Sequence, residues 1–262
     1  MTVLDFLKKK QNRRPISMVT CYDSWSAALI ARTDIDCVLV GDSVAMTLYG
    51  HDNTLNVDIE TMAAHTAAVR RGLPGGFIIG DMPFLSYRKG LEDTISNVGM
   101  LMKAGANAIK LEGADGNLDL IRHIVASGIP VMGHLGLTPQ SVHRFGGFRV
   151  QARDEEAALR LEDEALALQE AGCFSIVLEA VPASAAASVT SRLEIPVIGI
   201  GAGPDVDGQV LVLQDLLGLN PDFNPKFARR FLDGAGLIVD ALQAYHRDVG
   251  ERSFPTVQES YR

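Results

Sequence analysis

The stretch Lys103-Ala-Gly-Ala-Asn-Ala-Ile-Lys-Leu-Glu112 holds the unit from which this chain is built. Its glycine is typical of the left-handed turn that ends a helix. The apolar run behind the glycine is too short for a helix and has the composition of a strand buried on both faces. A charged residue closes the run. The same order recurs at residues 126–134 and 170–179, so the chain is predicted to alternate helices with parallel strands.

Other apolar runs and periodic segments complete this pattern. Further strands are expected at residues 16–21, 37–40, 77–80, 196–200 and 209–213. Helices are expected at 24–32, 59–70, 92–104, 118–126, 155–171 and 227–246, with Asp58 and Asp154 as N-caps and Pro182 in the first turn of a further helix. Eight strands predict an α/β fold, a closed (β/α)8 TIM-type barrel, with an open doubly wound sheet as the alternative. No linker divides the sequence, so residues 1–262 are expected to form a single barrel domain.

Composition and charge narrow the classes of function. The chain has 262 residues, of which 47% are apolar and 21% charged, and its net charge is −8. An acidic chain lacks the basic face that nucleic acid or an anionic membrane would require. No segment has the apolar length of a membrane span, and the N-terminus has no signal-peptide pattern. Cys21, Cys37 and Cys173 form no disulfide pattern and are expected to be small buried residues, so we expect a cytoplasmic enzyme.

The ends of the predicted strands carry the candidate chemistry, because barrel enzymes hold their active sites at the C-terminal ends of the strands. The polar residues at these ends are Asp42, Ser43, Asp81, Glu112, His134 and Glu179. One such residue is most simply a cap for the next helix, but this many at one mouth indicate a site. Carboxylates about 4 Å apart repel by roughly 4 kcal/mol at an effective dielectric near 20, so they must share protons or hold a cation. With no thiolate ligand among them, the preferred cation is Mg²⁺ or Mn²⁺.

Three residues near this mouth need separate interpretation. Lys110 faces the same way as Glu112, because side chains alternate along a strand, so it either forms a salt bridge with a neighbouring carboxylate or contacts a substrate carboxylate. Glu179 follows an apolar run, and apolar surroundings make a carboxylate a better general base. His134 either bonds a substrate oxygen or is a structural residue with satisfied hydrogen bonds.

Two long connections and one glycine-rich run are further candidates. The connections cover residues 44–57 and 135–153, and long loops in compact domains are usually functional. The second contains Phe145-Gly-Gly-Phe148, a candidate lid. Ile198-Gly-Ile-Gly-Ala-Gly203 follows the seventh strand, where barrels often bind phosphate, but a tight turn or close packing is the simpler interpretation.

In combination, these residues resemble the ketopantoate hydroxymethyltransferase family, from about residue 3 to residue 250. The motifs that carry the resemblance are, in order, Val40-Gly-Asp-Ser43, His65-Thr-Ala-Ala-Val-Arg-Arg-Gly72, Gly80-Asp-Met-Pro-Phe84, Lys110-Leu-Glu-Gly113, Met132-Gly-His-Leu-Gly-Leu-Thr-Pro-Gln140 and Ile198-Gly-Ile-Gly-Ala-Gly203. The resemblance implies an enzyme of pantothenate biosynthesis that moves the one-carbon unit of 5,10-methylenetetrahydrofolate to 3-methyl-2-oxobutanoate. The product would be 2-dehydropantoate, formed by metal-assisted enolisation and aldol-type addition.

The resemblance also implies roles for individual residues and for partners. Asp42, Asp81 and Glu112 would belong to the Mg²⁺ shell. The keto acid would contact Asp42, Ser43, Asp81, Lys110 and His134, and Glu179 would be the catalytic base. Its partners would be two small molecules, a keto acid and a folate, and the chain would assemble into a homo-oligomer, a decamer.

Two departures and two rival functions accompany this resemblance. Asn56 stands where the family usually has proline, and Gln214 stands where it usually has histidine. The nearer rival is a Mg²⁺-dependent carbon–carbon lyase of the isocitrate-lyase and phosphoenolpyruvate-mutase type, acting on a 2-oxo acid. Such a lyase would be expected to carry a reactive cysteine in a catalytic loop. The second rival is a barrel without activity that serves as a binding or assembly module.

Overall fold

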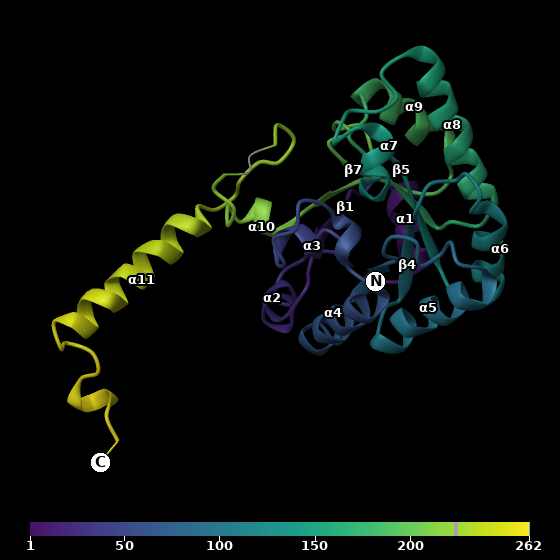
Figure 1. The fold of residues 1–262 in the computed structure, drawn as a ribbon. Helices are drawn as coiled ribbons and strands as arrows, with labels where there is room; N and C mark the ends of the chain where they lie inside the picture. Colours follow the sequence, from purple (N-terminus) through teal and green to yellow (C-terminus); the bar gives the residue numbers. More distant parts are fainter. Residues whose placement is uncertain (223–224, 262) are drawn as a thin grey trace. The chain divides into compact units, whose positions relative to one another are not determined.

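The computed structural model describes residues 1–222 and 225–261, which divide into two compact units, Met1–Val212 and Leu213–Arg262. The first unit contains the barrel strands with helices around them (Figure 1). The barrel is closed, each strand is parallel to the next, and β8 pairs with β1. Its strands are β1 (Ile16–Thr20), β2 (Cys37–Val40), β3 (Phe77–Asp81), β4 (Ala108–Glu112), β5 (Val131–Gly136), β6 (Ser175–Glu179), β7 (Val197–Ile200) and β8 (Gly208–Leu211). The predicted TIM-type barrel is confirmed, and the open sheet is wrong. The last strand ends earlier than predicted because Leu213 begins a helix.

Helices surround these strands in the first unit (Figure 1). They are α1 (Val3–Gln11), α2 (Ser24–Ile30), α3 (Val44–Thr47), α4 (Ile59–Gly72), α5 (Leu91–Ala104), α6 (Leu118–Ala126), α7 (Val142–Phe145), α8 (Glu155–Glu170) and α9 (Ala183–Arg192), with the 3-10 turns η1 (Thr54–Asn56) and η2 (Pro139–Ser141). Asp58 and Asp154 accept hydrogen bonds from the backbones of Thr61 and Ala157, so both predicted N-caps are confirmed. Pro182 is itself the N-cap of α9, one position outside the predicted first turn.

An apolar plug closes the N-terminal end of the barrel. Phe6 of α1 is fully buried, and its ring centroid lies 5.3 Å from that of Phe77 and 5.1 Å from that of Phe174. Phe77 opens β3 and Phe174 directly precedes β6, so the three rings meet below the sheet. Burying a phenylalanine side chain contributes about 1.5–3 kcal/mol. Because this end is filled with apolar rings, it leaves no room for a site, and the charged strand-end residues lie at the other end.

The second unit contains α10 (Leu213–Leu216), α11 (Gly234–Gly250) and η3 (Val257–Glu259). The helix predicted at 227–246 begins later, at Gly234, because the Asp233 side chain accepts a hydrogen bond from the backbone of Gly236 and caps it there. The barrel lies wholly in the first unit, and the expectation of one domain over 1–262 stays a prediction. Among the described helices, none is both long and apolar enough to cross a membrane.

Candidate active site

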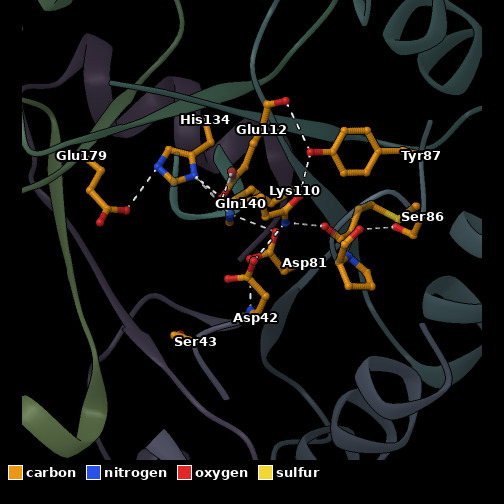
Figure 2. A network of polar contacts seen from close by, with 12 residues as sticks. Asp42, Ser43, Asp81, Ser86, Tyr87, Lys110, Glu112, His134, Gln140 and Glu179 are labelled. Carbon is orange, nitrogen blue, oxygen red and sulfur yellow. Dashed lines mark hydrogen bonds and ion pairs between the residues drawn. The ribbon is translucent and has the colours of Figure 1, made fainter. Parts of the chain in front are cut away.

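The strand register brings the predicted site residues together at the C-terminal end of the barrel (Figure 2). Asp81 pairs across the ladder with Lys110, and Glu112 pairs with His134. Glu179 pairs with Gly136, one strand further along. Strand alternation turns Lys110 and Glu112 to the same side, as predicted, above the apolar layer that contains Ala108.

Two buried aspartates form the acidic centre of this cluster. Asp42 is 4% exposed and Asp81 is 1% exposed, and the backbone N–H of Asp42 donates to Asp81 Oδ2 at 3.2 Å. Burial, with repulsion from Glu112, raises the pKa of Asp42 to about 6. Burial also raises the pKa of Asp81 to about 6, where attraction to Lys110 opposes repulsion from Asp42. Both carboxyls are therefore less acidic than usual, chiefly because they are buried.

Lys110 supplies the compensating positive charge. Its Nζ lies 2.9 Å from Asp81 Oδ1, and both side chains are almost fully buried. Burial lowers the pKa of Lys110, but attraction to Asp81, Glu112 and Asp42 outweighs that effect, so the pKa is raised and the side chain stays charged. Of the two interpretations, the structure shows the salt bridge; contact with a substrate carboxylate stays a prediction.

His134 stands between two carboxylates. Nδ1 lies 3.5 Å from Glu112 Oε1, and Nε2 lies 3.3 Å from Glu179 Oε2. Burial and the nearby Lys110 lower the pKa of His134, but its contacts with the two glutamates prevail and raise it to about 9. The Glu179 side chain is 20% exposed. Glu179 therefore lies beside an imidazole and partly open to solvent, and not in the apolar setting that its sequence neighbours suggested.

Ser43 lies beside the cluster and contacts a different partner. It is the N-cap residue of α3, and its Oγ lies 2.8 Å from the hydroxyl of Tyr22. Tyr22 is 1% exposed, and burial raises its pKa to about 12, so the hydroxyl keeps its proton. Sequence reasoning missed Tyr22, because it follows β1 without a charge that would mark it.

Gln140 is the second residue that sequence reasoning missed. It belongs to η2, outside any strand end, and it ends the motif that begins at Met132. Figure 2 shows it among Asp42, Glu112 and Tyr87 at the centre of the contacts. The only signal in the sequence was an uncharged polar residue in the long connection after the fifth strand.

A cavity of about 290 Å³ opens beside Glu112 and Gln140. Other residues that line it include Phe84, Arg144, Phe145 and Arg160. The connection predicted as a lid thus forms one wall of this cavity, through η2 and α7. Its movement as a lid stays a prediction. At the other glycine-rich run, a Cβ on Gly203 would stand 2.4 Å from Cβ of Ala183, which favours close packing over a phosphate site.

The donors at this mouth fit a hard divalent cation. Glu112 Oε1 is buried and makes no hydrogen bond among the described residues, although His134 Nδ1 lies 3.5 Å from it. As the side chains stand, no three His, Cys, Asp or Glu side chains within residues 1–222 and 225–261 enclose an ion. Mg²⁺ does not need such a cage, because it keeps several waters and binds through one or two carboxylates. Asp42 and Asp81, linked by the hydrogen bond from the Asp42 backbone N–H to Asp81, can supply those carboxylates.

The cysteines bear on the lyase rival. Cys21, Cys37 and Cys173, the three cysteines of the chain, are free and buried. Burial raises the pKa of the Cys21 and Cys37 thiols and raises that of Cys173 to about 12. None has the lowered pKa and exposure of a reactive thiol. The structure therefore offers no cysteine for the chemistry that this rival was expected to use.

Comparison with known proteins decides between families. A family model described as ketopantoate hydroxymethyltransferase matches residues 1–257. The chain belongs to the ketopantoate hydroxymethyltransferase family. A 3-methyl-2-oxobutanoate hydroxymethyltransferase of Bdellovibrio bacteriovorus is 58% identical over 260 residues, covering 99% of both chains. One of Coxiella burnetii is 54% identical over 259 residues, covering 98% of this chain and 97% of the relative. The resemblance drawn from the motifs, and the prediction of a hydroxymethyltransferase enzyme, are confirmed.

Solved structures with a similar fold include one that is described as a member of the superfamily of the lyase rival. A phosphonopyruvate hydrolase in complex with oxalate and Mg²⁺ has a TM-score of 0.67 at 13% identity, covering 99% of this chain and 93% of that chain. A 2,3-dimethylmalate lyase, described as a PEP mutase/isocitrate lyase superfamily member, has a TM-score of 0.60 at 16% identity, covering 99% of this chain and 91% of that chain. At these identities the likeness shows the shared barrel fold alone.

The two departures from the family pattern can now be located. Asn56 is exposed and ends η1, whose first residue Thr54 is buried. Gln214 lies in α10 of the second unit. Neither residue takes part in the contacts among Asp42, Asp81 and Glu112 described above.

Proposed function

We propose that this chain transfers a hydroxymethyl unit from 5,10-methylenetetrahydrofolate to 3-methyl-2-oxobutanoate and yields 2-dehydropantoate. The observation that supports this most is one mouth that combines three buried carboxylates, a buried lysine and a separate, partly exposed carboxylate. Family membership supplies the substrate. The buried carboxylates could bind a cation, and the partly exposed carboxylate could act as a base.

Asp42, Asp81 and Glu112 would hold Mg²⁺, with Mn²⁺ as its substitute. When bound, Mg²⁺ supplies a Lewis acid that polarises the keto group of the substrate. The protein's own part is to bind and orient the keto acid. The charged Lys110 side chain lies beside these carboxylates and would contact the substrate carboxylate. Ser43 would donate a hydrogen bond to the keto acid.

Glu179 would remove the proton from the branched carbon next to the keto group. Its carboxylate is partly exposed, which leaves it accessible to a substrate, and His134 holds it at 3.3 Å through Nε2. Because His134 also contacts Glu112, the imidazole fixes the base relative to the acidic cluster. Because both ring nitrogens of His134 have a partner, it would donate to a substrate oxygen by giving up one of these contacts.

The transfer balances with one water. The branched carbon forms a bond to the methylene carbon, and water supplies the hydroxyl group. Both bonds between the methylene carbon and the folate nitrogens break. The two nitrogens receive one hydrogen from the branched carbon and one from water, which regenerates tetrahydrofolate.

Assembly and location belong to the same proposal. We propose a homo-oligomer, a decamer, which would cover the apolar side chains that α11 exposes, among them Leu237, Leu242 and Tyr245. We place the enzyme in the cytoplasm, where three free thiols stay reduced. Light scattering after size-exclusion chromatography measures the assembly directly.

The first test is proton exchange. The purified protein is incubated with 3-methyl-2-oxobutanoate in D₂O, with and without Mg²⁺, and the branched-carbon proton is followed by NMR. We expect Mg²⁺-dependent exchange that Glu179→Gln largely abolishes. Because some enzymes enolise only with the second substrate bound, the measurement is repeated with tetrahydrofolate.

The outcomes separate the rivals. Exchange that depends on Mg²⁺ and Glu179 supports the transferase. Cleavage of a 2-oxo acid without folate would support the lyase. A folded protein that binds no Mg²⁺ and exchanges no proton, with or without tetrahydrofolate, would leave the inactive binding module as the better account.

A further inference from the structure

Gln140 is a buried polar residue that contacts the acidic cluster at Asp42 and Glu112. It is 7% exposed and is the second residue of the 3-10 turn η2, which begins at Pro139. Proline at the first position restricts φ of Pro139 to a value that suits this turn.

Each polar atom of the Gln140 side chain has a partner. Nε2 donates to Asp42 Oδ2 at 2.9 Å and to the backbone oxygen of Met82 at 2.9 Å. Oε1 accepts from the Tyr87 hydroxyl at 2.9 Å. Turning the amide over would place its oxygen against a carboxylate and a carbonyl, both acceptors. The orientation is therefore determined by its neighbours.

The backbone of Gln140 reaches a second acid. Its N–H donates to Glu112 Oε2 at 3.1 Å. Tyr87, which is 6% exposed, lies within 3.5 Å of the Glu112 backbone oxygen as well as holding the Gln140 amide. One residue thus holds a carboxylate of the β2 end and a carboxylate of the β4 end at once.

We infer that Gln140 is the positioning residue that aims Asp42 and Glu112 at the cation, with Tyr87 holding its amide in the donating orientation. This inference rests on the proposed function for the cation itself. The residue type suits the task. A lysine or arginine would also donate to Asp42 but would neutralise the charge that attracts a cation. A glutamate would add a fourth acid and could not donate when ionised. An amide donates and leaves the charge unchanged.

The experiment measures Mn²⁺ binding to the purified protein without substrate, by calorimetry and by the EPR spectrum of bound Mn²⁺. The variants are Gln140→Met, which keeps the length of the side chain and removes both polar atoms, and Tyr87→Phe, which removes only the hydroxyl. Ser141→Ala, in the same turn, is the matched control. All measurements are made well below the melting temperature of each variant.

We expect Gln140→Met to bind Mn²⁺ about 10- to 100-fold more weakly, since loss of an outer partner of a ligand costs this much at other metal sites. Tyr87→Phe should bind more weakly by a smaller factor, and Ser141→Ala should match the parent. The EPR spectrum of Mn²⁺ bound to Gln140→Met should change, because Asp42 is no longer held. A purely structural role would lower the melting temperature and leave both the affinity and the spectrum unchanged.

Two results would overturn the inference in different ways. If the parent binds Mn²⁺ and Gln140→Met binds it equally well, Gln140 does not position the ligands, and the proposed function stands. If the parent itself binds no Mn²⁺, the proposed cation site fails and this inference fails with it. Should Gln140→Met not fold, the affinity of Tyr87→Phe decides the matter.

Discussion

Lys110→Met should strongly destabilise the metal-free protein. Lys110 Nζ lies 2.9 Å from Asp81 Oδ1, and the two side chains are 4% and 1% exposed. At an effective dielectric near 20, their attraction is about 6 kcal/mol, partly cancelled by the desolvation of both ions. Removing one partner of such a buried pair typically costs about 3–5 kcal/mol, because the other charge is left uncompensated. For a chain of this size, that corresponds to a fall in melting temperature of roughly 6–20 °C.

The loss of stability caused by Lys110→Met should be larger at high pH than at low pH. The pKa values of Asp42 and Asp81 are raised to about 6 from the ordinary value of 3.8. A carboxyl with a raised folded-state pKa contributes stability below its unfolded-state pKa, and that stability is lost as pH rises through the folded-state pKa. Stability of the parent should therefore decline between about pH 4 and pH 6. In the variant these acids lose the positive charge of Lys110, so their pKa values rise further. The variant should therefore lose less stability relative to the parent at pH 5 than at pH 8.

The assay is urea unfolding of the metal-free protein, followed by circular dichroism at pH 5 and pH 8. Lys103→Met is the control, because Lys103 is exposed in the last turn of α5 and should lose at most about 1 kcal/mol. A variant at position 110 that is as stable as the parent at pH 8 would refute the reasoning. A loss of stability that is larger at pH 5 than at pH 8 would show that the loss does not come from the charges of Asp42 and Asp81.

Three further predictions concern other parts of the barrel. Phe6→Ala should lower the free energy of unfolding by about 3–5 kcal/mol in urea, since it empties the plug; a change below about 1 kcal/mol would contradict that role. Gly203→Val should lower the melting temperature in a thermal scan, because its φ is +81° and its Cβ would meet Ala183, and a variant as stable as the parent would argue against the close packing. Tyr22→Phe should raise KM for the keto acid about two- to tenfold, the worth of one hydrogen bond to Ser43, with Mn²⁺ affinity unchanged. An altered affinity there would place Ser43 with the cation and not with the substrate.

The candidate site was predictable where the alternation of side chains along one strand decides which way a residue points. The period of two along β4 was enough to place Lys110 beside Glu112 in the barrel. The partner of Lys110 was not predictable, because the pairing of Asp81 with Lys110 depends on the register between two strands, which sequence periodicity does not specify. Barrel closure followed from the count of strands, whereas the plug could not be foreseen, since Phe6 meets rings from strands far along the chain.

Gln140 and Tyr22 were missed for a related reason. Both are uncharged residues outside the strands, and each matters only through a hydrogen bond to a residue distant in sequence. Glu179 was found by position, but its surroundings were not, because the imidazole beside it comes from the neighbouring strand. Residues whose role is to hold another residue carry no chemical signal of their own in a single sequence.

Asp81, Asp42 and Glu179 have different neighbours, and these differences suit the different roles proposed for them. Asp81 forms a salt bridge with Lys110, whereas the Asp42 carboxylate accepts a hydrogen bond from the neutral amide of Gln140. A cation would therefore gain most beside Asp42, which forms no salt bridge among the described residues, although Lys110 and His134 attract its charge from further away. Glu179 sits on the far edge of the His134 ring from Glu112, so the imidazole lies between the acidic cluster and the base. A cation in direct contact with Glu179 would hold it in its charged form and weaken it as a base. If the proposed roles hold, this spacing by the imidazole ring would let the barrel bind the cation at one end of the cluster and keep the base at the other.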